Sequence, residues 1–222
     1  GAGKGWMTVL GAVAMVTMVG GNLLAIAQSS VKRMLAYSSI AHAGYLLVGV
    51  TVGAHENVRT EAIEATLFYL ATYAFAAIGA FAIVAILERR DGPESDDDGR
   101  WEGLAQRHPV LALAMTVFML SNAGIPPTAG FMGKLFVFKA ALQADAIGLA
   151  VVGLLSSLAG LYYYLRVVVS MYMKPSRDGV AEVAPRSTTY TWGLGIAAAA
   201  TLVAGLLPNT LAAQTKIATL LP

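Results

Sequence analysis

The chain has 222 residues, of which 57% are hydrophobic and only 13% are charged, and its mean hydropathy is +0.65. A soluble domain carries about twice that charged fraction, so the composition predicts an integral membrane protein. The absence of cysteine excludes disulfides, iron–sulfur ligation and thiol catalysis within the chain. The net charge of +2 says little, because charged residues are concentrated in connecting segments. We expect a lipid bilayer around the chain and no nucleic-acid partner.

Six segments are apolar over the roughly 17–25 residues that a helix needs to cross a bilayer. In chain order they cover about residues 6–28, 31–52, 62–87, 109–142, 146–173 and 190–207. We therefore predict an all-α membrane protein with six transmembrane helices in a single domain over residues 1–222. Because the chain begins Gly1-Ala2-Gly3-Lys4, with no methionine and no signal-peptide pattern, we expect it to be the C-terminal part of a longer protein.

Two polar linkers, residues 88–108 and 174–188, separate the later segments. The acidic run at 96–98 in the first linker predicts a solvated loop rather than a metal site. The tail from residue 209 is weakly amphipathic, and we expect it to lie along the membrane interface. The first, third and fifth connections carry most of the basic residues, namely Lys32, Arg33, Arg89, Arg90, Arg100, Arg107, Lys174, Arg177 and Arg186. Lysine and arginine are enriched in cytoplasmic loops, so this side is predicted to be cytoplasmic.

The fourth segment contains an interruption near its centre. Pro126 and Pro127 remove two backbone donors, while Gly124 and Gly130 loosen the chain and Ile125 is restricted by the proline that follows it. A lipid-exposed break would leave backbone polar groups unsatisfied in hydrocarbon. We therefore predict that the break is buried in protein or lines a wet cavity, as in the broken helices of transporters.

Lys134 follows this break within about two helical turns. Ionisable groups at membrane depth are costly and usually mark an ion or proton path. Burial disfavours its ammonium form, and the N-terminal dipole of the second half-helix repels a cation. We therefore predict that Lys134 exchanges protons. Lys139 lies closer to the helix end and fits a side chain that extends to the interface.

The second segment carries polar and small residues at helical spacing: Ser38, His42, Tyr45 and Gly49. This stripe could face a water-filled path, in which His42 would relay protons because histidine titrates near neutral pH. The alternative to a relay is a neutral histidine in the protein core, where a serine hydroxyl or a backbone carbonyl hydrogen-bonds to its ring. Lys32 and Arg33 open the segment at the predicted cytoplasmic edge, where they serve either as a topology signal or in the proton path. Arg166, two turns from the end of the fifth segment, either extends to the interface or has a function.

Three segments carry a family resemblance: QSSVKRMLAYSSIAHAGYLLVG (28–49), LSNAGIPPTAGFMGKLFVFKAAL (120–142) and GLYYYLRVVVSMY (160–172). In this order they resemble the subunit N family of bacterial NADH–quinone oxidoreductase, respiratory complex I, whose members are antiporter-like membrane subunits. The pattern GIPP-x-x-GF-x-GK alone also resembles subunits of multisubunit Na⁺/H⁺ antiporters. A passive membrane scaffold, whose polar residues only join helices, is the alternative from a different class.

The resemblance implies the second of two inverted five-helix repeats plus the closing helix of a subunit with fourteen transmembrane helices. Lys134 then matches the family's lysine beside the second broken helix, and Lys32 and His42 match family positions on the tenth helix, which implies that all three belong to the proton path. It further implies a bacterial inner membrane location and neighbouring membrane subunits M and K as partners. No cofactor would be bound by this chain, while NADH and quinone would be used elsewhere in the complex.

Overall fold

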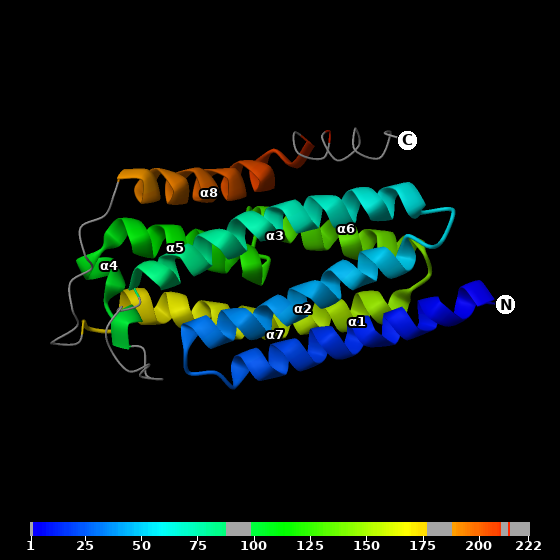
Figure 1. Ribbon diagram of the computed structural model, residues 1–222, viewed down its shortest axis with the longest axis horizontal. Coiled ribbons are helices and arrows are strands. Elements are labelled where there is room, and N and C mark those ends of the chain that lie inside the picture. The colour runs from blue at the N-terminus through cyan, green and yellow to red at the C-terminus, as the bar shows by residue number, and fades with distance from the viewer. Residues whose placement is uncertain (1, 88–98, 177–187, 210–212, 214–222) are drawn as a thin grey trace.

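The computed structural model describes residues 2–87, 99–176, 188–209 and 213, and every regular element in this part of the chain is a helix (Figure 1). The elements are α1 (Ala2–Ile26), α2 (Val31–Val52), α3 (Arg59–Leu87), the 3₁₀ turn η1 (Gly99–Trp101), α4 (Leu104–Arg107), α5 (Pro109–Ala123), α6 (Ala129–Gln143), α7 (Ile147–Met173) and α8 (Thr188–Leu206). The acidic run at 96–98, most of the second linker and nearly all of the tail after residue 209 lie outside the described residues.

The long helices lie side by side along the longest axis of the molecule, with α8 on one side of the bundle and α1 on the other (Figure 1). Four of them, α1, α2, α3 and α7, are long and apolar enough to cross a membrane. Over the described residues, the prediction of an all-helical, multi-pass membrane protein is therefore confirmed. The fourth predicted segment is occupied by two 15-residue helices, α5 and α6, and the sixth by α8 with 19 residues. The count of six crossings stays a prediction.

Local sequence explains where α5 begins and ends. Pro109 occupies its first turn, where a missing N–H costs no helical hydrogen bond. Gly124 ends the helix in the left-handed conformation, with φ of 79°, and its N–H donates to the carbonyls of Leu120 and Ser121. Pro126 and Pro127 then lack the donors that would continue the helix. The chain resumes as α6 after Thr128, whose backbone is extended.

The buried apolar residues form two clusters, one toward each end of the bundle. The first gathers side chains of α5, the ends of α3 and α7 and the start of α2, including Met34, Ile83, Phe118 and Met171. The second gathers α6 with α1 and the later part of α2, including Met18, Val48 and Val137. The interruption between α5 and α6 therefore lies where one apolar cluster gives way to the other.

The second half of the first linker is more ordered than a solvated loop. Trp101 and Leu104 are buried in the first apolar cluster, and the Gly103 N–H donates to the Ser170 carbonyl at 3.2 Å. Arg107 donates to two carbonyls of the same segment. Burial of the tryptophan and leucine side chains stabilises this part of the linker. Two apolar residues within a polar segment do not form a long apolar run, so hydropathy did not predict this structure.

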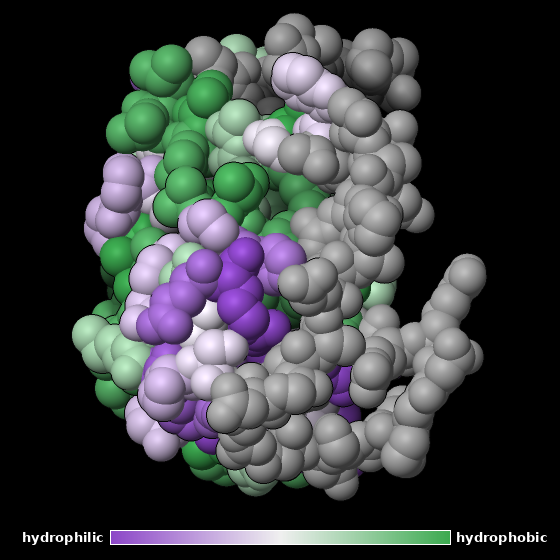
Figure 2. Space-filling view, turned by 90° about the vertical axis from the view of Figure 1, so that its left-hand side faces the viewer, coloured by the Kyte–Doolittle hydropathy of each residue, from purple (hydrophilic) through white to green (hydrophobic). Residues whose placement is uncertain are grey.

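Figure 2 looks onto the end of the bundle where α1 ends and α2 begins, and hydrophilic residues gather in the middle of that face. A pocket of about 240 Å³ lies at this end, with Ser29, Glu102, Arg166 and Lys174 among its lining residues. Lys174 forms a salt bridge with Glu102 at 2.9 Å. This is the end that the basic residues predict to be cytoplasmic.

Candidate functional site

Lys134 is the buried cation at the junction of α5 and α6. Its side chain is 6% exposed, and its ammonium group makes three hydrogen bonds. Nζ donates to the backbone carbonyls of Asn122 at 2.8 Å and Ala123 at 3.3 Å, and to the hydroxyl of Ser157 on α7 at 2.9 Å. The lysine therefore reaches back from α6 to the last residues of α5.

This geometry corrects the electrostatic argument drawn from the sequence. The last carbonyls of a helix have no partner within it, and they carry the negative end of the helix dipole. The sequence indicated only the start of α6, which repels a cation, whereas Lys134 also contacts the C-terminal end of α5, which attracts one. Gly124 leaves room for this contact, because a Cβ there would lie 3.1 Å from the lysine Cδ and 3.3 Å from Nζ.

The break itself is held by local hydrogen bonds. The Ser121 hydroxyl accepts the Gly130 N–H at 3.1 Å, across the gap between the two helices. The Thr128 hydroxyl donates to the Ile125 carbonyl at 2.7 Å, and the Thr128 N–H donates to the same oxygen. These side chains give the irregular backbone the partners that hydrocarbon would not supply.

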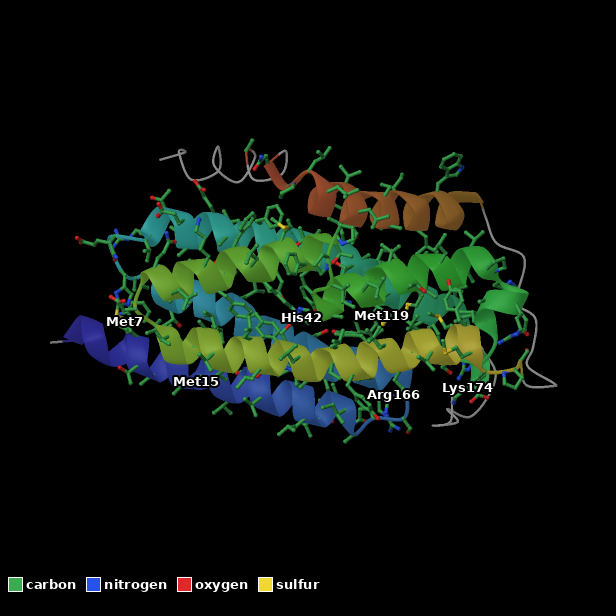
Figure 3. All side chains as sticks on the ribbon, turned by 180° about the vertical axis from the view of Figure 1, so that it is seen from behind. Met7, Met15, His42, Met119, Arg166 and Lys174 are labelled. Carbon is green, nitrogen blue, oxygen red and sulfur yellow. The ribbon has the colours of Figure 1, made fainter. Side chains whose placement is uncertain are left out.

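His42 lies on α2 inside the bundle, and Figure 3 places it near the middle of the molecule. Its side chain is 2% exposed, and both ring nitrogens are engaged. Nδ1 lies 2.6 Å from the Tyr69 hydroxyl and Nε2 lies 3.0 Å from the Tyr164 hydroxyl, while the ring stacks on Tyr73 at 4.4 Å between centroids. A neutral imidazole has one donor and one acceptor, and a tyrosine hydroxyl can complement either.

Tyr45 lies between the lysine and the histidine. The Lys134 ammonium is 5.1 Å from the centroid of the Tyr45 ring, which is the geometry of a cation–π contact. The edge of the same ring meets His42 at 5.7 Å between centroids. Its hydroxyl accepts a hydrogen bond of 3.2 Å from Asn22 of α1, and Asn22 also accepts one of 2.9 Å from Tyr163 of α7. A buried polar layer thus connects four helices.

The stripe predicted on α2 is buried in full, since Ser38, His42, Tyr45 and Gly49 all lie inside the bundle. Sequence reasoning missed the hydrogen bond that Ser157 makes with Lys134. The sequence feature that could have indicated this contact is a pair of serines, Ser156 and Ser157, in a largely apolar segment.

The other predicted cations do not join this layer. Lys32 is exposed at the start of α2, ten residues and about 15 Å along the helix axis from His42. Lys139 is exposed on α6, in keeping with a side chain that extends to the interface. Arg166 is exposed toward one end of the bundle, where it donates to the carbonyls of Ile26 and Gln28 at the end of α1 (Figure 3).

Comparison with known proteins gives consistent matches. Residues 2–160 match the family described as NADH:quinone oxidoreductase/Mrp antiporter, TM. A relative from Myxococcus xanthus, named NADH-quinone oxidoreductase subunit N, is 50% identical over a region that covers 89% of this chain and 42% of the relative. The resemblance carried by the three sequence segments is therefore confirmed.

Solved structures extend the comparison to the fold. A chain of respiratory complex I from Thermus thermophilus is 34% identical, with a TM-score of 0.79, and the match covers 93% of this chain and 45% of that one. A chain of the Mrp complex from Dietzia sp. DQ12-45-1b has a TM-score of 0.82 at 24% identity, covering 98% of this chain and 47% of that one, which shows a shared fold alone. This chain thus spans less than half the length of each of these proteins.

Proposed function

Since this chain belongs to the family of transmembrane subunits described for NADH:quinone oxidoreductases and Mrp antiporters, we propose that it is part of a proton-translocating subunit N of a bacterial NADH–quinone oxidoreductase. Relatives at 50% and 44% identity that carry this name support the proposal. The family description itself includes Mrp antiporters, so a multisubunit Na⁺/H⁺ antiporter is the second candidate of the same class.

In this proposal the chain is one transmembrane domain with six crossings. α5 and α6 together make a single crossing that is interrupted at residues 124–128, and α8 makes the last one. The end that carries Lys32, Arg166 and Lys174 faces the cytoplasm, because lysine and arginine are enriched on that side of bacterial inner-membrane proteins.

One observation carries the proposed role of the site: a lysine ammonium buried at the interruption of a membrane helix and bonded to the carbonyls of that helix. Lys134 accepts and releases a proton there. Its contacts suit both states, because the carbonyl end of α5 and the Tyr45 ring attract an ammonium, while the neutral amine still has N–H donors for the same carbonyls. The break gives the site irregular backbone and some freedom to move.

His42 passes the proton onward, and Lys32 serves nearer the cytoplasmic side. The two tyrosine hydroxyls on His42 support this role, because a hydroxyl that both donates and accepts can exchange protons with either ring nitrogen. Lys32 is about 15 Å from His42 along the helix, so intervening groups or water must complete the connection.

The redox chemistry takes place in other subunits of the complex, where NADH is oxidised and quinone is reduced, and no cofactor is assigned to this chain. Within the part of the chain that the structure describes, no three histidine or carboxylate residues lie grouped as metal ligands would. The proposed partners are the neighbouring membrane subunits, among them M and K. In this proposal, the redox reactions drive proton movement through this subunit by conformational or electrostatic coupling.

The test replaces Lys134 by methionine in the full-length subunit within its assembled complex, with Lys139→Met as the matched control. Both variants remove one lysine from α6, but only the first removes the buried one. We expect Lys134→Met to slow proton transfer through this subunit by a factor on the order of 100, while Lys139→Met stays near the wild type. NADH-driven proton uptake by inverted membrane vesicles measures this, normalised to the assembled complex on native gels.

Normal proton uptake in assembled Lys134→Met would contradict the proposal and favour a passive scaffold. The antiporter candidate makes a different prediction. Its exchange would be driven by a sodium gradient without NADH, and this activity would disappear in Lys134→Met.

A further inference from the structure

Gly205, near the end of α8, lies directly against the backbone of the break. A Cβ atom built on Gly205 would lie 2.1 Å from the Pro127 carbonyl oxygen, 2.4 Å from the Thr128 carbonyl carbon and 2.6 Å from the Ala129 nitrogen. All three atoms belong to the main chain, which cannot turn aside as a flexible side chain can. Only glycine fits at this position without a shift of the break or of the helix.

The backbone that Gly205 touches connects both halves of the lysine site. Residues 127–129 lead into α6, which carries Lys134 less than two turns further on. On the other side of the break are the carbonyls of Asn122 and Ala123 that accept from the ammonium. A displacement at residues 127–129 therefore changes the position of the lysine relative to its acceptors.

Beside this contact the helices do not close completely. An open hollow of about 300 Å³ lies between α8 and α3, with Phe75, Ala129, Thr201 and Ala204 in its lining. Leu194, Ala197 and Ala198 pack the first half of α8 against the first apolar cluster, whereas its last turn meets the backbone of the break at Gly205. Elsewhere on the same helix, Gly193 and Gly195 have open space where a Cβ would stand.

We propose that α8 holds the break in register through Gly205, so that Gly205 is a positioning residue for Lys134. The inference rests on the proposed function of Lys134, but it adds a requirement on a helix that contributes no polar group to the site. An alanine at 205 would need a shift of about 1 Å, and a displacement of that size can lower a rate about 100-fold.

The first experiment compares Gly205→Ala with Gly195→Ala in the full-length subunit within the complex. Alanine is a better helix former than glycine, so neither change weakens α8 by itself. We expect Gly205→Ala to lose proton translocation to nearly the extent of Lys134→Met, while Gly195→Ala keeps the wild-type rate. A wild-type rate in assembled Gly205→Ala overturns the proposal.

The double variant Lys134→Met with Gly205→Ala shows whether the glycine acts through the lysine. Residues that act as a unit give non-additive losses, whereas independent sites give losses that multiply. We expect the double variant to translocate no more slowly than Lys134→Met alone. Multiplied losses would mean that Gly205 acts elsewhere and would overturn the proposal.

A third measurement needs no pumping and separates this inference from the proposed function. Ala129 is fully buried, and the chain has no cysteine of its own, so Ala129→Cys reports on access to the break. We expect its alkylation by a membrane-permeant maleimide to rise at least tenfold with Gly205→Ala and to stay unchanged with Gly195→Ala. Ala14→Cys, fully buried on α1, must stay protected in both as a check on folding.

The two ideas fail in different ways. If Lys134→Met pumps normally while Ala129→Cys becomes accessible in Gly205→Ala, the proposed function is wrong and α8 still holds the break. If Ala129→Cys stays protected in Gly205→Ala, the inference is overturned, whatever the lysine does. Where Gly205→Ala assembles poorly, the alkylation is measured on the membrane-inserted chain, with Ala14→Cys as its reference.

Discussion

Replacing Lys134 by methionine should loosen the end of α5, even though the lysine belongs to α6. The ammonium is the donor to the Asn122 and Ala123 carbonyls, which lie beyond the last helical hydrogen bonds of α5. Methionine has a similar length and fills the site, but it cannot donate. The two buried carbonyls then lose their partner, and the last turn of α5 opens more easily.

The size of the effect follows from these two bonds. Hydrogen bonds between membrane helices average about 0.6 kcal/mol, and those made by charged groups begin at about 1.5 kcal/mol. Two bonds therefore stabilise the closed end by about 1–3 kcal/mol. Since 1.4 kcal/mol corresponds to a factor of ten, local opening should become roughly 10- to 100-fold more frequent.

Hydrogen–deuterium exchange of the assembled complex, followed by mass spectrometry, measures this opening. The amides of Gly124 and Ile125 both donate to the Leu120 carbonyl at 3.0 Å, so they report on the last turn of α5. We expect their exchange to accelerate by the factor given above in Lys134→Met and to stay unchanged in Lys139→Met. Unchanged exchange in Lys134→Met, or equal acceleration in both variants, would refute the capping role of the ammonium.

Two further predictions concern the histidine and the topology. His42→Gln keeps a polar side chain that can hydrogen-bond to Tyr69 or Tyr164, but glutamine cannot titrate. We therefore expect the complex to assemble and to translocate protons about tenfold more slowly. A normal rate would mean that His42 is a core residue without a role in proton transfer. Ser29 lies exposed between α1 and α2, and Asn57 lies exposed between α2 and α3. An impermeant maleimide should therefore label Ser29→Cys from the cytoplasm and Asn57→Cys from the outside, and the reverse pattern would invert the orientation.

The sequence by itself determined the features that depend on neighbours along the chain. Apolar length predicted the membrane helices, and α2 runs from Val31 to Val52 as expected from the apolar run that follows the turn at Ser29 and Ser30. Pro126 and Pro127 predicted an interruption for the same reason, since two missing donors disrupt helical hydrogen bonding whatever packs around them. The burial of Lys134 and His42 also followed from their place in apolar segments.

Only the tertiary structure decided which groups these residues meet. The hydroxyl on Lys134 comes from Ser157, 23 residues away, and the two on His42 come from Tyr69 and Tyr164, on α3 and α7. Nothing in local sequence places Gly205 against the break. Helix propensity and hydropathy act over a few residues, whereas these contacts depend on how helices far apart in the chain pack together. For the same reason, the sequence indicated that the start of α6 repels the Lys134 ammonium, but not that the C-terminal end of α5 attracts it.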